Sequence, residues 1–108
     1  MDFFKIMVPD EKQHANFKSV LHDARHLDRQ IFSQWADGFI DRDGKIVKEF
    51  QTTFNSTFWE VYLYRVFKEL DIYIDWHYPS PDFSLSKGEN EFIVEAVVSN
   101  SADGKINE

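Results

Sequence analysis

The sequence predicts one α/β domain of the mixed α+β kind, in which helices come first and a small antiparallel sheet follows. Apolar residues recur at helical spacing up to about residue 70, and alternation with a period of two begins after Asp71. Lys87-Gly88-Glu89-Asn90 then has the sequence of a tight hairpin turn. We therefore expect a single domain over residues 1–108, because 108 residues are too few for two domains.

The N-terminal part, residues 1–56, is predicted to be mainly helical. Residues 10–25 follow Pro9, residues 28–40 begin at Asp28 as an N-cap, and residues 45–54 follow the turn Asp41-Arg42-Asp43-Gly44. Each of the three segments carries apolar residues on one helical face.

The second part, residues 57–98, is predicted to contain one more helix and three strands. The helix over 58–70 has a core-facing stripe at i, i+4, i+7, i+8 and i+11: Trp59, Leu63, Val66, Phe67 and Leu70. A strand follows over 72–78, and residues 82–86 and 90–98 form the hairpin, with Gly88 at the first central position of a type II′ turn.

The arm over residues 92–98 is apolar apart from Glu95, which is typical of a central strand buried on both faces. A three-stranded sheet leaves one face and one edge uncovered, so we expect a homodimer partner or a missing C-terminal segment to cover them. Residues 99–108 are polar and are predicted to form a loop or a frayed tail.

Composition narrows the class of protein. Aromatic residues make up 17% of the chain, which is enough for a packed core. The absence of cysteine excludes disulfides, thiol nucleophiles and thiolate metal sites. No apolar run approaches the roughly 20 residues that span a bilayer, so we expect a cytoplasmic protein without a membrane partner. The net charge of −7 opposes binding to a phosphate backbone unless a local basic stripe or divalent cations compensate for it.

The hairpin register predicts a pair of acids. With Gly88-Glu89 as the loop, Lys87 faces Asn90 and Asp82 faces Glu95, with Cβ atoms about 4.5–5.5 Å apart. Two carboxylates so placed repel each other unless one is protonated or a cation lies between them. Ligation by carboxylate oxygens suits Mg²⁺ or Mn²⁺, so this pair predicts a site for one of these ions.

Pro81-Asp82-Phe83, a short hairpin and Ile93-Val94-Glu95-Ala96-Val97 resemble the signature of PD-(D/E)XK nucleases, the restriction-endonuclease-like phosphodiesterases. The resemblance covers the second half of the chain and implies a helix–strand–strand–strand core. It also implies that Asp82 and Glu95 are catalytic residues that hold Mg²⁺ or Mn²⁺. It further implies that Glu60, on the preceding helix, joins them as a catalytic residue and metal ligand.

One position departs from that signature. The family's lysine, which orients or deprotonates the attacking water, falls at Val97. Other polar residues are candidates to replace it: Lys87, Ser99, Asn100 and Lys105. The resemblance therefore implies either a metal-dependent nuclease acting on nucleic acid, with DNA favoured over RNA, or a catalytically inactive relative that serves as a binding or assembly module. A plain interaction domain is the third reading.

Structural alternatives exist for several of these residues. Thr57-Phe58-Trp59-Glu60 has the pattern of a capping box, in which Glu60 bonds back to the helix N-terminus. Asp82 can simply belong to the turn after Pro81. Glu49 is a further possible ligand, although a solvated helix face explains it as well. His22 and His26 have zinc-like i, i+4 spacing, but no third ligand is evident.

Overall fold

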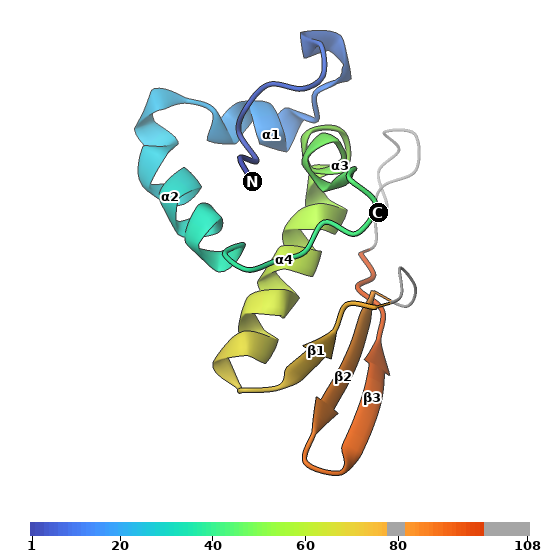
Figure 1. Cartoon of the computed structure of the whole chain (residues 1–108). Helices are drawn as coiled ribbons and strands as arrows, with labels where there is room; N and C mark the ends of the chain where they lie inside the picture. The colour runs from blue at the N-terminus through green and yellow to red at the C-terminus, as the bar shows by residue number, and fades with distance from the viewer. Residues whose placement is uncertain (78–81, 99–108) are drawn as a thin grey trace, which may run out of the picture.

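The computed structural model describes residues 1–77 and 82–98, and it confirms a mixed α+β chain in which the helices precede the sheet (Figure 1). The elements follow one another as η1 (Asp10–Lys12), α1 (Ala15–Val20), η2 (Asp23–Arg25), α2 (His26–Trp35), α3 (Ile46–Thr52), α4 (Phe54–Glu69), β1 (Tyr73–Asp75), β2 (Phe83–Lys87) and β3 (Asn90–Val94). The predicted tail, 99–108, lies outside the described residues. In Figure 1, α4 runs between α1 and α2 on one side and the sheet on the other.

The predicted helix over residues 10–25 is divided into three short helical segments, η1, α1 and η2. His14 and His22 have extended backbone, and the Nδ1 atom of each accepts a hydrogen bond from the main-chain N–H two residues later. Each histidine therefore caps a new turn. Since His22 precedes η2 and His26 begins α2, the two histidines do not share one helix. Their i, i+4 spacing therefore does not place them on one helical face and does not predict a zinc site.

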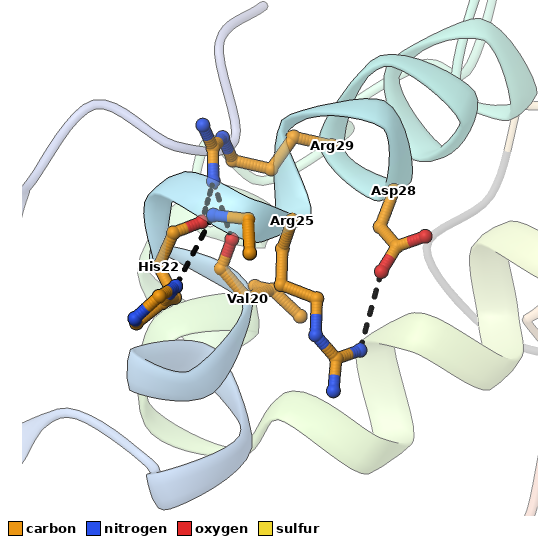
Figure 2. A network of polar contacts seen from close by, with 6 residues as sticks. Val20, His22, Arg25, Asp28 and Arg29 are labelled. Atoms are coloured by element: carbon orange, nitrogen blue, oxygen red, sulfur yellow. Dashed lines mark hydrogen bonds and ion pairs between the residues drawn. The ribbon is translucent and has the colours of Figure 1, made fainter.

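Arg29 closes the corner between α1 and α2 (Figure 2). Its Nη1 atom lies 2.7 Å from the carbonyl oxygen of Val20 and 2.8 Å from that of His22, and donates to both. The carbonyl of Val20 lies at the end of α1, where helix carbonyls lack intrahelical partners, and the guanidinium satisfies it. The carbonyl of His22 also accepts from the N–H of Arg25, so Arg29 adds a second hydrogen bond there. An ion pair of 3.2 Å between Arg25 and Asp28 lies on the outer side of the same corner.

Helix α4 begins earlier than the sequence predicts. Only Thr53 separates it from α3, so the predicted start at residue 58 is wrong. Phe54 packs on Phe50, with 4.7 Å between ring centroids, and this contact extends the helix upstream. Thr57 is buried inside the helix, which also rules out the capping-box interpretation of Glu60. The buried face of α4 differs from the predicted stripe and consists of Phe54, Thr57, Val61 and Tyr64.

The core of the N-terminal part consists of phenylalanine rings around Phe50, which contacts Phe3, Phe4, Phe17, Phe32 and Phe54. Gln51 holds the N-terminal segment in this core and is itself completely buried. Its Nε2 donates to the carbonyls of Phe3 and Lys5, and its Oε1 accepts from the N–H of Met7. Within residues 1–77 and 82–98, no helix has the length and hydropathy needed to cross a bilayer.

The sheet is an antiparallel meander in the order β1-β2-β3. The pairing runs from Lys87 opposite Asn90 to Phe83 opposite Val94, so the predicted two-residue loop and register are confirmed. Gly88 has φ +63°, as a type II′ turn requires at its first central position.

The central strand is β2, not the arm over residues 90–98, so the prediction of a buried central strand there is wrong. Phe83 and Leu85 of β2 are buried, and Phe83 contacts Phe67 of α4. In contrast, Phe92 and Ile93 of β3 are 46% and 71% exposed. The reason is topological: β1 pairs with β2, which leaves the apolar β3 at an edge.

Candidate functional site

A polar pocket of about 180 Å³ lies where the loop before α3 meets α4 and the start of β2. Among the described residues, carboxylates from four separate segments converge on it, together with one arginine. The lining residues are Phe39, Ile40, Asp41, Arg42, Asp43, Ile46, Glu49, Glu60 and Asp82. Two of the three acids expected in the site, Glu60 and Asp82, are therefore brought together although 22 positions separate them in the sequence.

Glu60 reaches the pocket from the first half of α4, directly before the buried Val61, and its side chain is half-buried. Burial is the main cause that raises its pKa to about 7, and the charge of Asp82 raises it further. The positive charge of Arg42 acts in the opposite direction. A carboxyl group with such a pKa exchanges its proton near neutral pH, which is typical of groups at functional sites.

Asp82 reaches the pocket from the position directly before β2. Its Oδ2 accepts a hydrogen bond of 2.8 Å from the main-chain N–H of Ala96, across the open end of the hairpin. Its carbonyl accepts a second bond of 3.0 Å from Arg42. Asp82 is thus more than a turn residue, because both its side chain and its main chain are held in place.

The loop before α3 forms one wall of the pocket. The resemblance to PD-(D/E)XK nucleases does not account for this wall, because it covers only the second half of the chain. Asp41 Oδ1 accepts from the N–H groups of Lys45 and Ile46, and Asp43 Oδ1 accepts from Lys45, so both acids cap α3. The sequence indicated only a turn here. A role of this loop in the site could have been inferred from the density of acids, because Asp41, Asp43 and Glu49 lie within nine residues.

Glu49 projects from α3 into the same pocket, so it is more than a residue on a solvated helix face. Partial burial raises its pKa, and the charges of Asp43, Asp41 and Asp82 act in the same direction, against Lys45. The electrostatic coupling of Glu49 to Asp82 and to Glu60 makes these residues one acidic cluster.

Glu95, the third acid predicted for the site, lies outside the pocket. The register would place it opposite Asp82, but the pairing ends at Phe83 and Val94, and Glu95 is exposed. Instead, the N–H of the next residue, Ala96, donates a hydrogen bond to the Asp82 carboxylate. The structure therefore brings Glu60 and Asp82 to one pocket and leaves Glu95 exposed and outside its lining.

Of the candidates to replace the missing lysine, Lys87 is the one that lies within residues 1–77 and 82–98, and it does not line the pocket. Val97 is 75% exposed, and Lys87 donates to the carbonyl of Leu70 at the opposite end of the hairpin. Ser99, Asn100 and Lys105 lie outside the described residues. Tyr64, one turn after Glu60 on α4, does not line the pocket, and its hydroxyl donates to the carbonyl of Asp37.

The donor set of the pocket consists of carboxylate oxygens, which suits a hard cation such as Mg²⁺ or Mn²⁺. Glu60 and Asp82 fit this role because they face one pocket and their charges oppose each other. With the side chains as they lie, residues 1–77 and 82–98 contain no group of three or more acids or histidines close enough to hold a metal ion.

A larger hollow of about 560 Å³ lies on the outer face of the sheet. It is lined by strand residues that include the exposed Tyr73 and Ile93, and the charged groups among the described residues of its lining are Asp75 of β1 and Glu91 of β3. Asp75 already accepts from the N–H of His77. The smaller pocket gathers five acids and an arginine from four segments, so we place the candidate site there.

No protein-family model, curated protein or solved structure matches this chain in comparisons with known proteins.

Proposed function

We propose that this chain is a metal-dependent nuclease-like domain that hydrolyses phosphodiester bonds of nucleic acid, with DNA as the preferred substrate. The observation that carries the proposal is the convergence of Glu60 and Asp82 on one pocket, where the pKa of Glu60 is about 7. Acids that oppose each other in this way favour a divalent cation between them, since it removes the repulsion.

Glu60 and Asp82 would hold Mg²⁺ or Mn²⁺, and Glu49 faces the same space. When bound, such an ion lowers the pKa of a water molecule and stabilises the negative charge on the phosphate and on the leaving oxygen. The ion would also supply the positive charge that this protein of net charge −7 otherwise lacks for approaching a polyanion.

Hydrolysis adds water across one P–O bond. The water oxygen forms the new bond to phosphorus, the bond to the leaving oxygen breaks, and a proton reaches that oxygen to give a hydroxyl group and a phosphate monoester. The proton that the water loses needs an acceptor. Glu49 faces the same pocket and is not one of the two residues that would hold the ion, so it is the carboxylate available to accept this proton.

The test is a Mn²⁺ titration, followed by electron paramagnetic resonance of the free ion, together with cleavage of labelled single-stranded DNA, double-stranded DNA and RNA. We expect Mn²⁺ binding and cleavage that a chelator abolishes. Asp82→Asn should lose both, and Glu60→Gln should lose cleavage and keep only weak Mn²⁺ binding. Glu91→Gln is the matched control, because Glu91 is an exposed glutamate of β3 outside this pocket. Circular dichroism verifies that each variant folds.

A catalytically inactive binding or assembly module is the second candidate function. It is favoured by Val97 at the position of the family's lysine and by the exposed placement of Glu95. Mn²⁺ binding without cleavage of any of the three nucleic acids would support this candidate over the nuclease. Absence of Mn²⁺ binding would contradict both candidates and support a plain interaction domain.

A further inference from the structure

Arg42 links three separate parts of the chain at the acidic pocket. Its Nη2 donates to the carbonyl of Asp82 at 3.0 Å, and its guanidinium carbon lies 5.5 Å from the centroid of the Trp76 ring. Arg42 itself belongs to the loop before α3, Trp76 follows β1, and Asp82 precedes β2. One half-buried side chain thus connects the helical N-terminal part to the start of the central strand.

Of the described residues that line the pocket, Arg42 alone carries a positive charge. Acids face it from its own loop (Asp41 and Asp43), from α3 (Glu49), from α4 (Glu60) and from the start of β2 (Asp82). Lys45 adds a positive charge beside Glu49 from the same loop. Without Arg42, the acids of this pocket would have to be stabilised by protons or by an external cation.

We propose that Arg42 is a positioning residue of this pocket: it fixes Asp82 through the main-chain carbonyl and holds Glu60 and Asp82 together as their counter-charge until a divalent cation replaces it. The replacement by a cation rests on the proposed function, whereas the positioning role does not. Arginine suits this position because its planar group donates in one direction and stacks on an aromatic ring in another.

The positioning role is tested by a double-mutant cycle in thermal unfolding at pH 8 and low salt. Arg42→Gln keeps a donor group but removes the charge, and should lower Tm by about 4–8 °C. In a Glu60→Gln background the same change should lower Tm by less than half as much, because one of the two charges that Arg42 holds together is already gone. Arg42→Lys retains the charge and should lose less than half as much as Arg42→Gln.

A purely structural role predicts a different pattern. If Arg42 only supported the carbonyl of Asp82, Arg42→Gln would lower Tm equally in both backgrounds, and this result would overturn the proposal. An unchanged Tm in the wild-type background would overturn it as well.

The replacement by a cation is tested by Mn²⁺ titration of the full chain. Arg42→Gln should bind Mn²⁺ about tenfold more tightly than the wild type, because a competing positive charge has been removed. Weaker binding would overturn this step. If neither protein binds Mn²⁺, the proposed function and the replacement step both fail, while the thermal cycle still decides the positioning role.

Discussion

The carboxylate of Asp82 accepts a hydrogen bond from the main-chain N–H of Ala96, with 2.8 Å between Oδ2 and N. This bond spans the open end of the β2–β3 hairpin, beyond the last strand pair. It gives Asp82 a structural role in addition to its charge in the pocket, and the two roles respond differently to substitution.

Asp82→Ala is expected to lower the free energy of unfolding by about 1–2 kcal/mol, because the N–H of Ala96 loses a charged acceptor. Asp82→Asn keeps an acceptor oxygen and should lose less than half of that, while Mn²⁺ binding disappears in both variants. Urea unfolding measures the stability. Equal losses of stability in both variants would show that the charge, and not the hydrogen bond, holds the hairpin end.

Glu60→Gln is expected to stabilise the protein at alkaline pH. Folding raises the pKa of Glu60 from 4.5 to about 7, so the protonated form is favoured in the folded state. Its contribution to stability is therefore present in full below pH 4.5 and is lost as the pH rises through 7. With allowance for the water that still reaches the carboxyl, the gain at pH 8 is on the order of 1–2 kcal/mol.

The measurement for Glu60→Gln is urea unfolding at pH 5 and pH 8. The variant and the wild type should differ little at pH 5, and the difference should develop between the two pH values. A constant difference would mean that the amide changes packing and that the charge of Glu60 plays no part.

Mn²⁺ affinity is expected to rise with pH, because the ion must displace the proton of Glu60. At pH 6 most of the cation-free protein carries that proton, so the affinity should be about tenfold lower than at pH 8. Titrations at pH 6, 7 and 8 measure the slope. Residual binding by Glu60→Gln should lack this slope, and a slope that persists in that variant would assign the proton to another group.

Glu95→Gln is expected to weaken Mn²⁺ binding by less than about threefold, a change of under 1 kcal/mol in binding free energy. The reason is that Glu95 is exposed and does not line the pocket. A loss as large as that of Asp82→Asn would show instead that Glu95 turns inward when the cation binds, as the resemblance implies.

Gln51→Leu is expected to lower the free energy of unfolding by about 2–4 kcal/mol, because three buried or partly buried main-chain groups lose their partners. The groups affected are the carbonyls of Phe3 and Lys5 and the N–H of Met7. Gln30→Leu, at an exposed position of α2, is the matched control and should change stability by less than about 0.5 kcal/mol. A similar effect of both substitutions would mean that the N-terminal segment adds little to stability.

Local sequence patterns were sufficient for the order of the elements and for the hairpin register. The period of the apolar residues separates helices from strands, and Gly88 at φ +63° sets a two-residue loop that aligns Phe83 with Val94. These features depend on neighbours in the chain. The boundary of α4 was misjudged for the opposite reason, since the contact of Phe54 with Phe50 extends it upstream of Asn55.

Tertiary packing alone decided which strand is central and which acids meet. The apolar sequence of β3 does not determine whether the strand is buried or exposed. The strand lies at the edge because β1 pairs with β2. Likewise, Asp41, Arg42 and Asp43 read as a turn until the fold carries that loop against Glu60 and Asp82. Charges that are distant in the sequence shift one another's pKa only when folding removes the water between them.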